Sequence, residues 1–309
     1  MSYSLINQSN LTNNVDKFVR DILSESMNFD DIGNSLNELY LPFIDNYDDK
    51  LCYSKAIQAF VSSTRGIVGD SYPCNVIWNR YNIQQLIESI LCYRQDVIDA
   101  DKSWHDQESK NRNSLESYVR DLIDHYSKSL VVRIDLMYKE EDRDLVTVDM
   151  FNNHMKKLRE LISNKKSCFK YLQGYAWALE QGGKRGGFHC HLLLIYDGAR
   201  REGDCALAIE VAKKWSDITE ELGAYYNCNS NKNKKKHQVK DEFGNDRLGV
   251  GMIHRNKLLE VENAIHVALY LTKLNKKDQQ LKVWVTNMRT FGHGTYRNTK
   301  RRGLPTIPK

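Results

Sequence analysis

A glycine-rich turn between two apolar segments is the feature that most restricts what this chain can fold into. Residues 170–180, KYLQGYAWALE, alternate in character and are rich in aromatic side chains, which is typical of a β-strand. Residues 188–196, FHCHLLLIY, contain an aliphatic run that predicts a buried strand. The segment between them, QGGKRGG, is typical of a tight connection. The sequence therefore predicts a β-hairpin over residues 170–196.

Two histidines lie at the start of the second strand of this hairpin. Because side chains alternate between the faces of a strand, His189 and His191 project from one face with their Cα atoms about 7 Å apart, and Cys190 projects from the other. Glu180 ends the first strand and is expected near His189 across the turn. Burying two unpaired imidazoles would be costly. Two nitrogens and a carboxylate suit Mn²⁺ or Mg²⁺, and suit Zn²⁺ less well. The alternative is that both histidines are packed or hydrogen-bonded, as single histidines on strands usually are.

A tyrosine and a lysine share one side of a later predicted helix, residues 261–277. Tyr270 and Lys273 lie opposite the apolar stripe of this helix, together with His266 and Lys277. A tyrosine hydroxyl, with a reference pKa of about 10, is a poor nucleophile at neutral pH. It becomes useful when a metal polarises a phosphodiester and a cation stabilises the developing charge. These residues predict cleavage of a DNA strand by transesterification, and the alternative is an amphipathic tyrosine on a surface.

The remaining periodicity divides the chain into a helical front and a mixed back. Four front segments place apolar residues at spacings of three and four and predict helices, the last of them starting at Ser114: residues 16–27, 54–65, 82–100 and 114–128. The back adds strands at 130–138, 248–255 and 281–291, helices at 150–165 and 205–223, and a polar loop at 227–247. The predicted fold class is α+β, with a mostly antiparallel sheet in the order β-α-β-β-α-β-α, preceded by a helical N-terminal region.

Charge is distributed unevenly along the chain. Residues 1–130 carry 12 lysines and arginines against 19 acidic residues, residues 131–265 carry 23 against 20, and residues 266–309 carry 10 against one. The gradient predicts that the C-terminal part contacts a polyanion, with a solvated basic tail as the alternative. The candidate phosphate contacts are Lys184, Arg185, Arg289, the five lysines of residues 232–240, Arg297, Lys300, Arg301 and Arg302. Candidates for stacking on unpaired bases are Trp177, Trp284, Phe291 and Tyr296, with core packing favoured for the two tryptophans.

Several absences disfavour other classes of protein. The longest apolar run is too short to cross a bilayer, so no membrane partner is expected. The first ten residues lack the basic start and apolar segment of a signal peptide. The seven cysteines form no CxxC pair, which favours free thiols in a reducing cytoplasm. No GxxxxGK[ST] segment occurs, so the chain is not expected to be an ATP-driven helicase.

Together these motifs resemble those of the HUH endonucleases, a superfamily of rolling-circle replication initiators, relaxases and related transposases. The resemblance rests on Glu180, the His189-Cys190-His191 strand and the YLTK helix at 270–273. The block WALEQGG…GFHCHLLLI, the long helical front and RTFG at 289–292 look most like the inovirus-type initiators of filamentous phages and prophages. The resemblance covers roughly residues 128–295. It implies an HUH-type DNA-nicking domain at 128–295, after a helical N-terminal region of unknown role at 1–127 and before a basic tail at 296–309.

The resemblance implies a role for each motif residue. His189 and His191 would be ligands of Mn²⁺ or Mg²⁺, with Glu180 as the third ligand. Tyr270 would be the nucleophile, leaving a 5′-phosphotyrosine and a free 3′-OH that primes rolling-circle replication, and Lys273 would stabilise charge near the scissile phosphate. The implied partners are single-stranded or supercoiled origin DNA and a host helicase and polymerase, in the cytoplasm of a bacterial host cell.

Two residues depart from the pattern of the superfamily. Cys190 is smaller than the bulky apolar residue that usually separates the two histidines. His266 stands one helical turn before Tyr270, where some initiators carry a second tyrosine, and this argues against a scheme with two alternating tyrosines. Two other functions stay open. The chain would be either a prophage regulator or accessory protein that binds DNA without cutting it, or a metal-dependent nuclease that uses water as its nucleophile.

Overall fold

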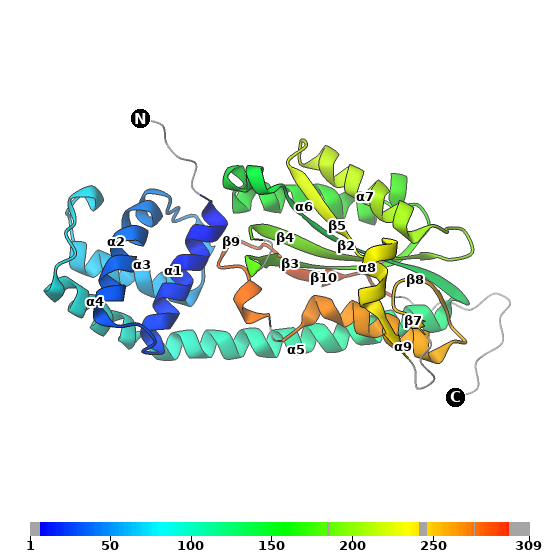
Figure 1. The fold of residues 1–309 in the computed structure, drawn as a ribbon, viewed down its shortest axis with the longest axis horizontal. Coiled ribbons are helices and arrows are strands. Elements are labelled where there is room, and N and C mark those ends of the chain that lie inside the picture. The colour runs from blue at the N-terminus through cyan, green and yellow to red at the C-terminus, as the bar shows by residue number, and fades with distance from the viewer. Residues whose placement is uncertain (1–6, 184–185, 241–245, 275, 297–309) are drawn as a thin grey trace.

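The computed structural model describes residues 7–183, 186–240, 246–274 and 276–296, and contains a helical body beside a body of strands and helices (Figure 1). The longest helix, α5 (Arg94–His125), leaves the helical body and runs along the second body. The other elements of the helical N-terminal region are α1 (Gln8–Leu23), α2 (Phe29–Asp45), β1 (Leu51–Tyr53), α3 (Lys55–Val68), η1 (Pro73–Asn75, a 3₁₀ turn) and α4 (Arg80–Cys92). The predicted α+β class with a helical N-terminal region is confirmed.

The second body is built on a six-stranded antiparallel sheet. The strand order is β10-β3-β4-β2-β5, and β8 also pairs with β2. The strands are β2 (Lys128–Tyr138), β3 (Leu172–Gln181), β4 (Phe188–Asp197), β5 (Gly223–Asn227), β8 (Gly251–His254) and β10 (Phe291–His293). The predicted hairpin is confirmed, because β3 and β4 pair directly. The glycines at 182, 183, 186 and 187 all have positive φ, a conformation that explains the composition of the turn.

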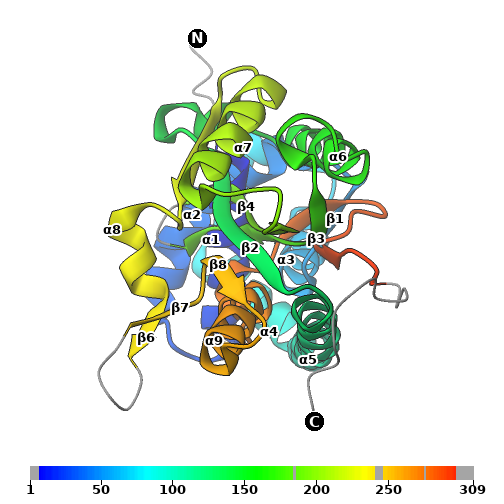
Figure 2. The same cartoon turned by 90° about the vertical axis from the view of Figure 1, so that its right-hand side faces the viewer.

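Helices cover both faces of this sheet (Figure 2). On one face lie α6 (Val148–Ser163) and α7 (Asp204–Ile218), and on the other lie α5 and α9 (Leu258–Ala268). The stripe of α5 that packs on the sheet has the three- and four-residue spacing of an amphipathic helix: Leu115, Tyr118, Val119, Leu122 and Ile123. A side chain at Gly174 of β3 would collide with Leu122, so this glycine permits the close approach of α5.

Several predicted boundaries were wrong. Ser114 lies inside α5 and starts no helix, because no glycine or proline interrupts residues 94–125. The helix predicted at 205–223 ends at Ile218, and Gly223 opens β5, which the sequence did not predict. The helix predicted at 261–277 runs from 258 to 268 and tightens into the 3₁₀ turn η6 (Leu269–Thr272).

Two C-terminal segments also differ from their predictions. The strand predicted at 281–291 is two short strands, β9 (Val283–Val285) and β10, separated by a turn in which Asn287 has positive φ. The predicted polar loop at 227–247 contains α8 (Asn231–Lys234), η5 (Lys235–His237), β6 (Gln238–Lys240) and the start of β7 (Asp246–Leu248). The remaining 3₁₀ turns are η2 (Glu140–Leu145), η3 (Ser167–Phe169) and η7 (Lys277–Gln279).

The helical N-terminal region is joined to the sheet body by more than α5. Strand β1 pairs with β9, so two segments more than 200 residues apart in the chain form a two-stranded sheet. One apolar core extends from α1–α4 to the face of the main sheet that α6 and α7 cover. A second core lies between the opposite face and α5 and α9. No helix in the described part of the chain is long and apolar enough to cross a membrane.

Candidate active site

The β3–β4 hairpin brings the three predicted metal ligands together. Glu180 is the register partner of His189, and Ala178 is the partner of His191. The side chains of Glu180, His189 and His191 therefore lie on one face of the sheet, the face covered by α5 and α9, while Cys190 packs in the core of the other face. All three ligand candidates are buried.

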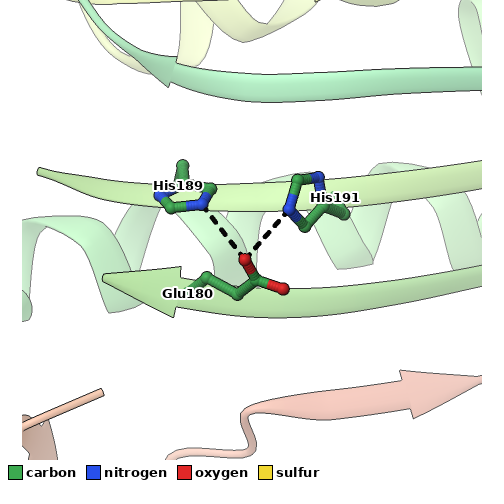
Figure 3. A group of neighbouring side chains, drawn as sticks. All are labelled: Glu180, His189 and His191. Carbon is green, nitrogen blue, oxygen red and sulfur yellow. Dashed lines mark hydrogen bonds and ion pairs between the residues drawn. The ribbon is translucent and has the colours of Figure 1, made fainter. Parts of the chain in front are cut away.

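Figure 3 shows both imidazoles turned toward one carboxylate oxygen. The Nε2 atom of His191 lies 3.1 Å from Oε2 of Glu180, and the Nε2 atom of His189 lies 3.4 Å from the same oxygen. One ligand atom from each of the three residues lies within 4.8 Å of the others. Two imidazole nitrogens and one carboxylate oxygen form a donor set suited to a divalent ion.

The opposite ring nitrogens of the two histidines have acceptors of their own. The Nδ1 atom of His191 lies 2.6 Å from Oδ1 of Asp135 on β2, and the Nδ1 atom of His189 lies 3.4 Å from the carbonyl oxygen of Gly187. An acceptor at Nδ1 favours the tautomer whose Nε2 lone pair is free for a metal, an arrangement common around metal-ligating histidines. The donor set therefore fits a divalent ion in orientation as well as in composition.

Asp135 was not identified from the sequence, although a signal for it existed. The strand segment LVVRIDLMY places two charged residues, Arg133 and Asp135, two positions apart among aliphatic residues. Both are buried on the face that carries the histidines, and Nη2 of Arg133 lies 3.6 Å from Oδ1 of Asp135. Opposite charges with this spacing in a buried strand predict a polar cluster.

A lysine ammonium lies among the three ligand candidates. Nζ of Lys276 is 2.6 Å from Oε1 of Glu180 and 3.1 Å from Nε2 of His191, and the lysine is buried. The residue follows η6 in an irregular segment, and no pattern in the sequence separates it from its neighbour Lys277. The ammonium of Lys276 therefore places a positive charge beside both Oε1 of Glu180 and Nε2 of His191.

Protonation in the cluster is compatible with metal ligation. Burial would raise the pKa of the Glu180 carboxyl, but its contacts with His189 and His191 and the charge of Lys276 lower it well below its ordinary value. Burial lowers the pKa of His189, although its contact with Glu180 opposes the shift. Burial also lowers the pKa of Lys276, again against the influence of Glu180. An anionic carboxylate and a neutral imidazole are the forms that bind a metal.

Tyr270 lies beside this cluster, on η6 and not on a regular α-helix as predicted. Its ring centroid is 5.3 Å from that of His191, with the two rings nearly perpendicular at 89°. The neighbours Leu269, Leu271 and Thr272 are buried, whereas Tyr270 is half-buried. The tight turn thus fixes its apolar residues in the core and leaves the tyrosine at the edge of the site.

Three positive charges surround the ring of Tyr270. The ring centroid lies 3.9 Å from Nζ of Lys276, 4.3 Å from Nζ of Lys273 and 4.0 Å from Cζ of Arg133. Cations over an aromatic face are attracted to it. They also provide donors for a phosphate group brought next to the hydroxyl. Lys273 was predicted from the sequence, whereas Arg133 and Lys276 were not.

The other predicted nucleic-acid contacts lie away from this cluster or outside the described residues. Lys184 and Arg185 in the hairpin turn are outside the described residues, as are Arg297, Lys300, Arg301 and Arg302. Arg289 is exposed between β9 and β10. Burial and the nearby charge of Arg289 lower the pKa of Arg159, whose guanidinium packs on Trp177 on the opposite face of the sheet. Arg289 is therefore not part of the Glu180 cluster.

The predicted stacking aromatics have different surroundings. Trp177 is buried, as predicted, and Trp284 is half-buried in the β1–β9 pair. Phe291 is half-buried on β10. The hydroxyl of Tyr296 forms a hydrogen bond of 2.8 Å with Nδ1 of His125, at the end of α5.

Comparison with known proteins identifies one family. A family model described as the YagK/YfjJ C-terminal domain matches residues 101–294. The match begins inside α5 and ends just after β10, so it contains the whole of the main sheet and the cluster around Glu180 and Tyr270. No curated protein and no solved structure matches the chain.

Proposed function

The chain belongs to the YagK/YfjJ C-terminal domain family, whose model matches well over half of its 309 residues, and we propose that the matched region nicks one strand of DNA in the manner of an HUH endonuclease. In this proposal the sheet with its β3–β4 hairpin and the later α9–η6 segment form an HUH-type nicking domain. The substrate is single-stranded or supercoiled DNA at a replication origin. Since the chain has no phosphate-binding GxxxxGK[ST] motif, a host helicase would separate the strands.

The observation that carries the proposal is the position of Tyr270. Its ring lies against His191, and three cations lie within 4.3 Å of its centroid. A tyrosine that attacks a phosphodiester needs a means of stabilising both the phenolate and the charge on phosphorus.

Glu180, His189 and His191 would hold Mn²⁺ or Mg²⁺. When bound, the ion supplies Lewis-acid polarisation of the scissile phosphodiester. Asp135 orients His191, and the carbonyl of Gly187 orients His189. Lys273 and Arg133 hold the phosphate oxygens beside the tyrosine hydroxyl.

Tyr270 is the nucleophile in this scheme. A bond forms between its hydroxyl oxygen and phosphorus, and the bond from phosphorus to the 3′-oxygen of the preceding nucleotide breaks. The phenolic proton is transferred, in net terms, to the departing 3′-oxygen. The products are a 5′-phosphotyrosine on the protein and a free 3′-OH, from which a host polymerase can extend. Because the position one turn earlier holds His266 and not a second tyrosine, Tyr270 is the single nucleophile in this scheme.

A covalent-adduct assay tests this function. The protein is incubated with labelled single-stranded DNA from the replicon that encodes it, with Mn²⁺ or Mg²⁺, and run on a denaturing gel. We expect a metal-dependent adduct that is lost in Tyr270→Phe and in the His189→Ala/His191→Ala double variant. Tyr225→Phe is the matched control, since this tyrosine is 48% exposed on the edge strand β5, and it should form the adduct normally.

The other outcomes identify the alternatives. Cleavage that leaves no adduct and survives Tyr270→Phe would show a hydrolytic nuclease. Binding to the correct origin with neither cleavage nor adduct would show a regulator that uses the fold without the chemistry.

A further inference from the structure

We propose that the cavity between the helical N-terminal region, α5 and the β9–β10 segment binds one unpaired nucleobase next to the scissile phosphate and selects it. The cavity has a volume of about 680 Å³. This volume is within the usual range for sites that enclose a small organic group. The inference rests on the proposed nicking function, because it assigns the cavity to the same DNA strand.

The cavity is continuous with the candidate active site. Glu180, Lys273 and Lys276 belong to its lining as well as to the cluster around Tyr270. A nucleotide whose phosphate lies between these lysines would therefore have its base directed into the cavity. One DNA strand could therefore contact the candidate active site and the cavity at the same time.

The walls offer flat aromatic surfaces. Trp104 on α5, Trp284 on β9 and Phe291 on β10 line the cavity, and all three are half-buried. Trp284 and Phe291 were candidates for base stacking from the sequence. Base–aromatic stacking accepts every base, because each base has a π-face. These rings would hold the base without choosing its identity.

Uncharged amides in the same walls can make the choice. Gln107, Gln279 and Gln280 line the cavity, and each amide offers both donors and an acceptor. Among the described residues, the side chains of Gln279 and Gln280 have no hydrogen-bond partner. Glutamine amides read the edges of unstacked bases by paired hydrogen bonds. Amides beside aromatic rings are thus suited to a nucleobase.

The charges at the cavity suit a nucleotide more than a cationic ligand. Of the carboxylates that line the cavity, Asp101 is neutralised by Arg20 at 2.9 Å and by Lys277 at 2.6 Å. Glu180 is paired with Lys276 at 2.6 Å, and Glu108 accepts a hydrogen bond from Asn111. Lys55, at the start of α3, is exposed at the cavity. Lys55 and Lys273 are therefore available for the phosphates on either side of the bound base.

This assignment gives the helical N-terminal region a function. Ser54, Lys55 and Gln58, at the start of α3, form part of the lining, so the region closes one side of the cavity. The acidic balance of residues 1–130 is compatible with this role, because a base pocket does not require a large phosphate-binding face. The region would therefore help to select the base beside the nick, together with Gln279 and Gln280.

An abasic-site scan tests the proposal. The background is Tyr270→Phe, so that binding is measured without cleavage. Single-stranded oligonucleotides carrying one abasic site at successive positions around the nick are titrated against the Tyr270→Phe protein and against the same protein with Trp104→Leu and Trp284→Leu. We expect one position at which loss of the base weakens binding about 5- to 150-fold, the range that stacking on one or two rings produces. In the tryptophan variant the same abasic site should have almost no further effect.

Two further variants test the choice of base and provide a control outside the cavity. Gln107→Leu changes an exposed residue of α5 that is not needed for packing, and it should reduce the preference among the four bases at that position. Tyr81→Leu removes a 70% exposed aromatic residue on α4, outside the cavity, and should bind every oligonucleotide as the background does.

The outcomes separate this proposal from the nicking function. If no position shows coupling to the tryptophans while the protein with Tyr270 intact still forms its adduct, the pocket is overturned and the nicking function stands. If the coupling is present but no adduct forms, the cavity binds a base in a protein that does not cut DNA. Equal binding of every oligonucleotide by every folded variant would overturn the pocket outright.

Discussion

At the scale of single residues, the metal site is best tested by replacing Asp135, which contacts His191. A carboxylate behind a ligating histidine orients the ring and raises its basicity, and its loss typically costs 10- to 100-fold in metal affinity. Asp135→Asn keeps the size of the side chain and removes its charge, so we expect Mn²⁺ affinity to fall by roughly that factor. Isothermal titration with Mn²⁺ measures the change.

The control for Asp135→Asn lies on the neighbouring strand. Asp197 ends β4, where it accepts a hydrogen bond from the backbone of Ala199, far from the histidines. Asp197→Asn should leave Mn²⁺ affinity unchanged. If Asp135→Asn binds Mn²⁺ as tightly as the native protein does, His191 is not a ligand oriented by Asp135.

The packing of α6 on the sheet contains a pH-sensitive contact at the scale of elements. Nδ1 of His154 on α6 lies 2.9 Å from the hydroxyl of Tyr138 at the end of β2. Burial, with the charge of Lys157, lowers the pKa of His154, while Glu220 opposes the shift. The unfolded chain therefore takes up this proton at a higher pH than the folded chain, and the free energy of unfolding should fall as the pH drops below about 6.5.

Replacing His154 tests this contact. His154→Gln keeps a hydrogen-bond acceptor for Tyr138 and cannot titrate, so part of the loss of stability below about pH 6.5 should disappear, up to about 1.4 kcal/mol per pH unit for one proton. Urea unfolding at a series of pH values measures it. His266→Gln, at an exposed position of α9, is the matched control. Identical pH profiles for the native and His154→Gln proteins would contradict the prediction.

The attachment of the helical region to the sheet body is a property of the whole molecule, and Asp16 lies at its centre. This buried carboxylate of α1 accepts a hydrogen bond from Ser54 at 2.5 Å, pairs with Arg20 at 2.7 Å and lies 3.6 Å from Nζ of Lys282, next to β9. Asp16→Ala would leave the buried ammonium of Lys282 without this partner, and would remove one of the two carboxylates that pair with the half-buried Arg20. We expect a loss of about 3–5 kcal/mol in the free energy of unfolding.

A surface carboxylate on the same helix supplies the comparison. Asp21 pairs with Lys17 at 3.8 Å near the surface, and its replacement by alanine should cost less than about 1 kcal/mol. Both variants are measured by urea unfolding. Similar losses for the two would mean that Asp16 does not hold the two bodies together.

The sequence by itself determined the α+β class, the β3–β4 hairpin and the grouping of Glu180 with the two histidines. These features are local. Strand alternation and a glycine-rich turn set which side chains share a face, and Glu180 and His191 are only 11 residues apart in the chain. The predictions of where α5 begins, where α7 ends and of one continuous strand at 281–291 were wrong. The local signals at these places are weak, and tertiary packing decided the outcome.

Only the tertiary structure decided what surrounds that local cluster. Asp135 lies 56 residues before His191 in the chain, and Lys276 lies 85 residues after it. Both reach the histidine because β2 pairs with β4 in one particular register and because α9 packs beneath the same face of the sheet. The cavity beside Glu180 likewise combines α3, α5 and the β9–β10 segment. Contacts of this kind depend on the pairing and packing of distant elements, which no short stretch of sequence encodes.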